Sequence, residues 1–82
     1  MSPEQLRVLR ALAAGQTLKA HRYLDGRKVF QLHTLEGGTQ TLRAGTVEAL
    51  VAAGLLDSNK KFPAATFWLT PAAQRLLAGI DK

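Results

Sequence analysis

The stretch TLKAHRYLDGRKVFQLH, residues 17–33, contains two runs of strand-forming residues on either side of an Asp25-Gly26 pair. An Asp-Gly pair between two such runs is a strong signal for a β-hairpin. The sequence therefore predicts an antiparallel hairpin with strands at Thr17–Tyr23 and Lys28–Leu35.

The length of the hairpin loop decides which residues share a face of the sheet. With a two-residue loop at Asp25-Gly26, Leu18 faces His33, and both faces mix polar with apolar side chains. With a three-residue loop at Leu24–Gly26, whose glycine takes the left-handed bulge position, Leu18 pairs with Leu32 instead. We predict the second register because it produces one apolar face.

In this register Ala20 also pairs with Phe30, and the opposite face of the hairpin is polar and basic. That face carries Lys19, His21, Tyr23, Arg27, Val29 and Gln31, with Arg22 and Lys28 near the tip. The hairpin is thus expected to be a basic ribbon.

Before the hairpin, the start of the chain has the pattern of a capped helix. Ser2 suits the cap, Pro3 the first helical position, and Gln5 completes a capping box. Leucines follow at helical spacing, and Gly15 suits the left-handed residue that ends a helix. The pattern predicts a helix over residues 3–14.

After the hairpin, Gly37-Gly38 marks a second turn, and Thr39–Leu42 is expected to add a short third strand. A helix is predicted over Ala44–Ala53, with Gly54 as its stop. Its inward residues are expected to be Val47, Leu50 and Val51.

Residues 57–61 are predicted to be a loop that leads through Pro63 to a strand at Thr66–Leu69. Thr70-Pro71 then opens a last helix, whose apolar residues are Ala73, Leu76, Leu77 and Ile80. Adjacent strand residues point to opposite faces, so Phe67 and Trp68 cannot both enter one core from the same face. We expect Trp68 to pack elsewhere or to be exposed.

The composition fits one domain over residues 1–82, because domains cluster at about 50 to 200 residues. Eleven Lys and Arg against six Asp and Glu give a net charge of +5, which attracts polyanions. There is no cysteine, so disulfides and thiolate metal sites are excluded. With no signal peptide and no apolar run of membrane-spanning length, we expect a cytoplasmic protein with no membrane partner.

The run TVEALVAAGLL at residues 46–56, followed by a polar loop and Leu69-Thr70-Pro71-Ala72, resembles winged-helix regulators of the MarR and PadR families. In those families a recognition helix ends in Gly-Leu, a two-stranded wing follows, and a Leu-Thr-Pro cap opens the next helix. The resemblance covers residues 42–80. It implies an α+β, winged-helix-like domain.

The sequence departs from the helix-turn-helix pattern in front of the recognition helix. There the families have a second helix that braces the recognition helix, whereas this chain has the hairpin and the Gly-Gly turn. The expected outward face of the recognition helix is Glu48, Ala49, Ala52 and Ala53. These side chains offer little for hydrogen bonding to base edges.

The order of the whole chain also resembles the YjhX-type toxin family of small bacterial proteins. The features shared are a first helix, an Ala-Gly turn, a hairpin with an Asp25-Gly26-Arg27 tip, and a helix that ends before Gly54. The matching residues are Gln5, Leu9, Leu12, Ala13, Gly15 and Arg22. This resemblance implies a protein target that handles DNA, such as a topoisomerase.

We expect no enzymatic activity and no cofactor. His21 and His33 are the only histidines, and the hairpin register puts them on opposite faces or well apart, so a metal site is hard to assemble. Each of the six acidic residues has a structural position on a helix, in a turn or at the end of an element.

The remaining candidates are binding residues. The basic residues expected to contact nucleic-acid phosphates, with DNA as the first expectation, are Arg22, Arg27, Lys28, Arg43, Lys60 and Lys61. The alternatives are a protein-interaction module, toxin-like or regulatory, and a domain that acts by forming a homodimer. The aromatic anchors for such an interface would be Tyr23, Phe62 and Trp68.

Overall fold

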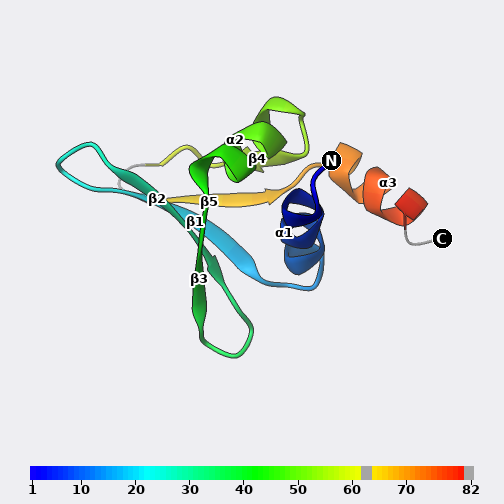
Figure 1. Ribbon diagram of the computed structural model, residues 1–82, viewed down its shortest axis with the longest axis horizontal. Helices are drawn as coiled ribbons and strands as arrows, with labels where there is room; N and C mark the ends of the chain where they lie inside the picture. Colours follow the sequence, from blue (N-terminus) through cyan, green and yellow to red (C-terminus); the bar gives the residue numbers. More distant parts are fainter. Residues whose placement is uncertain (62–63, 81–82) are drawn as a thin grey trace.

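A computed structural model describes residues 1–61 and 64–80 and shows an α+β fold of helices and one antiparallel sheet (Figure 1). The elements in chain order are α1 (Pro3–Ala13), β1 (Thr17–Arg22), β2 (Lys28–His33), β3 (Thr39–Leu42), α2 (Ala44–Ala52), β4 (Leu56–Ser58), β5 (Ala64–Leu69) and α3 (Pro71–Ile80).

The predicted register of the first hairpin is confirmed. Leu18 pairs with Leu32, and Ala20 pairs with Phe30. The loop has three residues: the Tyr23 N–H donates to the Arg27 carbonyl at 2.8 Å, and the Gly26 N–H donates to the Tyr23 carbonyl at 3.0 Å. Gly26 has a φ of +91°, the left-handed conformation that this bulged loop requires.

The turn between β2 and β3 repeats this geometry. The Thr34 N–H donates to the Gly38 carbonyl at 2.9 Å, and the Gly37 N–H donates to the Thr34 carbonyl at 3.1 Å. Gly37 has a φ of +90°. The expected third strand, Thr39–Leu42, is confirmed. However, β2 ends at His33 rather than at Leu35, because the turn takes the intervening residues.

The strand order is β3-β2-β1-β5-β4, with every neighbouring pair antiparallel. The last strand pairs with the first, so that Phe67 lies opposite Leu18. The prediction that residues 57–61 are all loop was wrong, because Asp57 and Ser58 belong to β4. A strand of three residues is too short to show an alternating pattern in the sequence.

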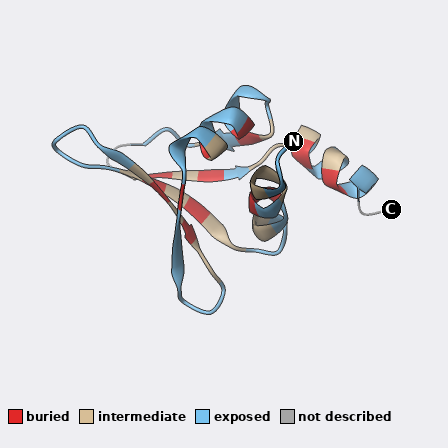
Figure 2. Cartoon of the chain, viewed as in Figure 1, coloured by how far each residue is buried: buried red, intermediate tan, exposed pale blue. Residues whose placement is uncertain are grey.

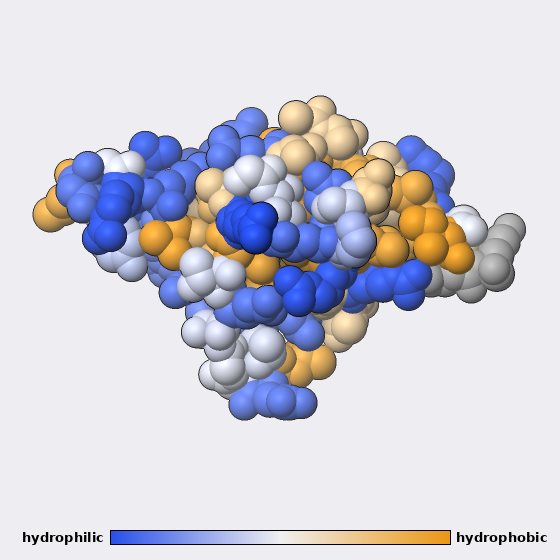
Figure 3. Space-filling view, in the orientation of Figure 1, coloured by the Kyte–Doolittle hydropathy of each residue, from blue (hydrophilic) through white to orange (hydrophobic). Residues whose placement is uncertain are grey.

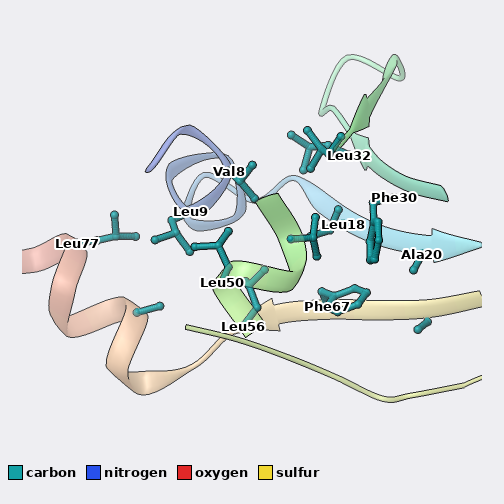
Figure 4. Close-up of a cluster of buried hydrophobic side chains, with 14 residues drawn as sticks. Val8, Leu9, Leu18, Ala20, Phe30, Leu32, Leu50, Leu56, Phe67 and Leu77 are labelled. Carbon is teal, nitrogen blue, oxygen red and sulfur yellow. The ribbon is translucent and has the colours of Figure 1, made fainter. Parts of the chain in front are cut away.

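The buried core lies on one face of the sheet, where the helices cover it (Figures 2 and 4). Leu18 is at its centre and is fully buried between Leu32 and Phe67 on the neighbouring strands. The helices contribute Val8 and Leu9 from α1, Val47 and Leu50 from α2, and Ala73 and Leu77 from α3.

Val51 was expected to face inward but does not. Val51 and Ile80, an apolar residue of the last helix, are each 43% exposed. On the short helix α2, Val47 and Leu50 already fill the stripe that meets the sheet, and Val51 lies at the edge of that stripe. Ile80 is the last residue of α3, beyond the end of the core.

Side-chain hydrogen bonds fix the ends of the helices. The capping box is formed as predicted: the Gln5 N–H donates to the Ser2 hydroxyl at 3.1 Å, and the Ser2 N–H donates to the Gln5 side chain at 3.0 Å. The Thr46 hydroxyl donates to Glu4 at 3.1 Å and so links α2 to α1. The Thr70 hydroxyl donates to the Gly54 carbonyl at 2.6 Å and links α3 to the end of α2.

The molecule is elongated, with principal extents of 44 × 29 × 21 Å, because the β1–β2 hairpin projects at one end and α3 at the other (Figure 1). All residues from Arg22 to Lys28 are exposed. In the described ranges, none of the helices has the length and apolar character needed to cross a bilayer.

The hairpin loop yields a stability prediction. At Gly26 an added Cβ would meet nothing within 4 Å, so Gly26→Ala adds left-handed strain of about 1–2 kcal/mol without a clash. The lower entropy of the unfolded chain offsets roughly 0.5–1 kcal/mol of it. We expect the free energy of unfolding to fall by up to about 1.5 kcal/mol, measured by urea denaturation.

Gly45→Ala is the matched control, because its Cβ also enters open space but its φ is not positive. That variant should be more stable by up to about 1 kcal/mol, since it lies in α2. Equal effects of the two substitutions would contradict the assigned turn.

Candidate nucleic-acid interface

Arg22 and Lys28 form the last pair of the β1–β2 ladder. Each lies two positions from a core residue, Ala20 on β1 and Phe30 on β2. Side chains alternate along a strand, so both cations lie on the core face of the sheet, beyond the part that the helices cover. Two like charges directly opposite each other destabilise a hairpin, so this pair lowers the stability of the β1–β2 hairpin.

Lys60 and Lys61 come from the loop after β4. Asn59 holds the base of this loop: its side-chain oxygen accepts from the Lys61 N–H at 3.3 Å and from the Thr66 N–H at 3.1 Å. Lys60 has a φ of +56°, in the left-handed region that residues with a Cβ adopt rarely. Its backbone conformation is therefore one that glycine would adopt more easily.

The hairpin and this loop place their cations around one pocket of about 250 Å³. Its lining consists of Ala20, Arg22, Lys28, Ser58, Lys60, Lys61, Ala65 and Phe67. We call it the cationic pocket. In Figure 3 the projecting hairpin end of the molecule is mostly hydrophilic.

Among the described residues that line the cationic pocket, none is acidic. Within residues 1–61 and 64–80, no carboxylate forms an ion pair with any of its four basic side chains. The Lys28 ammonium lies 5.2 Å from the centroid of the Phe30 ring, a cation–π contact that holds it against the sheet. The pocket thus has the electrostatic character of an anion site, with several positive charges that lack an internal partner.

Arg27 lies outside the cationic pocket, although the sequence suggested it as a phosphate contact. Its guanidinium forms an ion pair with Asp25 at 2.9 Å and lies 5.3 Å from the centroid of the Tyr23 ring. The Arg27 N–H also donates to the Asp25 carboxylate at 3.0 Å. The contacts of Arg27 are therefore with Asp25 and Tyr23 in the turn between β1 and β2.

Arg43 also lies outside the cationic pocket. It is the residue before α2, in extended backbone, and its side chain forms no capping hydrogen bond. The structure therefore brings together four of the six basic candidates and separates the other two.

The aromatic candidates do not form one cluster. Tyr23 and Trp68 are both about half exposed, and alternation along the strands puts them on the face of the sheet opposite the core. Trp68 comes one residue after Phe67, the partner of Leu18, so it lies beside Thr17. Tyr23 is six residues further along the chain from Thr17, about 20 Å away. Phe62 lies outside the described residues.

The sequence predicted that the two histidines lie on opposite faces of the hairpin or well apart. They lie on the same face but well apart, so the second alternative is the one found. His21 pairs with Val29 and His33 pairs with Thr17, which puts the histidines about 13 Å apart along the hairpin. In the described part of the chain, no group of three or more His, Cys, Asp or Glu side chains could hold a metal ion.

The outward face of α2 has the composition expected from the sequence. Glu48, Ala49, Ala52 and Ala53 are all exposed. No side chain among them donates a hydrogen bond, so this face is poorly suited to reading base edges in a major groove. The sequence did not identify four residues of the pocket as site residues: Ala20, Ser58, Ala65 and Phe67. The last three join the site only through the pairing of β5 with β1 and β4.

Comparisons of the chain with protein-family models, with curated proteins and with solved structures found no match.

The conformation of Lys60 yields a second stability prediction. Lys60→Gly relieves a left-handed strain of about 1–2 kcal/mol and adds unfolded-state entropy worth roughly 0.5–1 kcal/mol. We expect the free energy of unfolding to stay unchanged or to rise by up to about 1.5 kcal/mol, measured by urea denaturation.

Lys61→Gly is the control from the same loop, because Lys61 has no positive φ. At this position glycine relieves no strain and only adds entropy to the unfolded chain, so the free energy of unfolding should fall by about 0.5–1 kcal/mol. An equal loss in both variants would show that lysine at position 60 is not held against the preference of the backbone.

Proposed function

We propose that this chain is a non-enzymatic module that binds nucleic acid by contacting its phosphate backbone. The observation that carries the proposal is the gathering of Arg22, Lys28, Lys60 and Lys61 around one pocket, with no acidic side chain among the described residues of its lining. Phosphates are recognised by such clusters of Lys and Arg. The net charge of +5 adds a general attraction to polyanions.

Two features of the site are easier to explain if a polyanion binds there. Arg22 and Lys28 repel each other across the ladder, and Lys60 has a backbone conformation that disfavours any residue with a Cβ. A bound phosphate would neutralise the repulsion between Arg22 and Lys28 and would contact the side chain of Lys60. Binding would thus offset part of the local destabilisation.

The proposed mode of binding is winged-helix-like in its elements but not in its readout. α2 and the β4–β5 pair follow each other as a recognition helix and a wing do in the MarR and PadR families, and the wing would supply Lys60 and Lys61. Because α2 presents Glu48 and alanines, we propose contacts to the backbone with little base reading in a duplex groove.

The proposal predicts salt-sensitive binding that depends on the pocket lysines. Fluorescence anisotropy of a labelled oligonucleotide, measured from about 50 to about 200 mM salt, should show affinity that falls linearly with salt on logarithmic axes. Lys60→Ala/Lys61→Ala should weaken binding and reduce the slope by about one for each phosphate that the variant no longer neutralises.

The control Arg7→Ala/Arg75→Ala removes the same charge from exposed positions on α1 and α3. This double variant should keep most of the slope of affinity against salt concentration. The proposal is wrong if the two double variants reduce the affinity equally, since total charge rather than the pocket would then drive binding. It is also wrong if the native chain binds no nucleic acid at low salt.

One observation favours protein interaction as a second candidate function. Trp68, the single tryptophan of the chain, is 45% exposed on the sheet face opposite the core. Aromatic residues in such positions anchor protein interfaces. A toxin-like or regulatory partner, or a second copy of the chain, would cover it.

This alternative predicts that a partner changes the environment of Trp68. If the chain forms a homodimer through this face, the tryptophan emission should shift to shorter wavelength as the protein concentration rises, and Trp68→Ala should abolish dimers in sedimentation experiments. Emission and mass that do not change with concentration would exclude the homodimer.

A further inference from the structure

The cationic pocket continues into a second pocket under α2. The second pocket has a volume of about 350 Å³ and shares Lys28, Ser58 and Phe67 with the first. The shared residues show that the two pockets adjoin. We call the two adjoining pockets the groove; it extends from the hairpin and the β4–β5 loop to the last turns of α2. The size of the second pocket is within the roughly 300–1,000 Å³ typical of sites for small organic groups.

The chemistry of the groove changes from one end to the other. The end between the hairpin and the loop is cationic. The end under α2 is lined mainly by apolar side chains, Phe30, Val47, Val51 and Ala52, and Glu48 is the one acidic residue in the part of its lining that the structure describes. Lys28 lies at the junction and is held there over the Phe30 ring.

We infer that this groove takes an unpaired nucleotide of a single strand, with its phosphate at the cationic end and its base under α2. The inference rests on the proposed function and deepens it. In a duplex the bases are stacked and paired inside, so a concave site reaches only the phosphates. In a single strand a base can leave the stack and enter an apolar pocket.

Glu48 sets the orientation of the nucleotide and discriminates among bases. Its carboxylate repels phosphate, which keeps the backbone at the lysine end of the groove. The same carboxylate accepts hydrogen bonds and so matches the exocyclic amine of cytosine, whereas thymine presents O4, an acceptor, at the same position of its ring. The groove should therefore prefer cytosine over thymine, two bases of similar size.

The test uses fluorescence anisotropy with oligo(dC), oligo(dT) and a duplex of the same length, at about 150 mM salt. Oligo(dC) should bind at least about tenfold tighter than the duplex, given the contribution of a buried base, and about fivefold tighter than oligo(dT), given one discriminating hydrogen bond. Glu48→Gln should bring the affinities for oligo(dC) and oligo(dT) together, because an amide can both donate and accept.

Ala52→Leu narrows the apolar end of the groove without touching a cation. Ala52 is exposed on α2, so the substitution leaves the core intact. It should reduce the affinity for oligo(dC) about tenfold, to the level of the duplex. Ala49→Leu is the matched control, since Ala49 is exposed on the same helix but lines neither pocket, and it should bind as the native chain does.

The outcomes separate this inference from the proposed function. If the duplex binds as tightly as the single strands with the same dependence on salt, or if Ala52→Leu and Ala49→Leu behave alike, the cationic pocket stands and the unpaired-base groove is wrong. If neither the duplex nor the single strands bind even at about 50 mM salt, both fail.

Discussion

The left-handed turn at Gly26 fixes the register of the β1–β2 hairpin, and the position of every other element depends on that register. With a three-residue loop, Leu18 and Ala20 share a face with Leu32 and Phe30. That apolar face receives the helices on one side of the sheet, and β5 pairs with β1 so that Phe67 completes it. A shift by one residue would put every side chain of one strand on the other face. The core and the candidate site are therefore set by the same turn.

The same register explains why the cations gather. Arg22 and Lys28 are on the core face by alternation but lie beyond the reach of the helices, so they border an uncovered end of that face rather than the core. The loop after β4 returns Lys60 and Lys61 to the same end. Repulsion within this cluster and the strained backbone of Lys60 weaken the fold locally, while the buried leucines and the linked helix ends hold the domain together. A ligand with several negative charges would relieve this repulsion.

Much of the fold could be predicted from the sequence because its signals are local. The hairpin register follows from the need for one apolar face, the capping box from Ser2 and Gln5, and the ends of the first two helices from Gly15 and Gly54. β4 could not be predicted, since three residues carry no period and its pairing with β5 is set by the tertiary fold.

The basic candidates could be named from their residue types, but their grouping could not. Arg27 forms an ion pair with Asp25 in the turn. Lys28, the next residue, ends the β1–β2 ladder and lies on the core face of the sheet. The apolar groove under α2 depends on Phe30 and Val51, which come together only when the helix packs on the sheet.

If the cationic pocket is the surface that meets nucleic-acid phosphates, NMR chemical-shift mapping should locate binding there. Backbone amide spectra of the labelled protein would be followed during titration with a short oligonucleotide. We expect the largest shifts on Arg22, Lys28, Ser58, Lys60 and Lys61, and we expect them to diminish as salt is added. Shifts centred instead on Thr17, Thr39 and Trp68, on the opposite face of the sheet, would contradict this expectation.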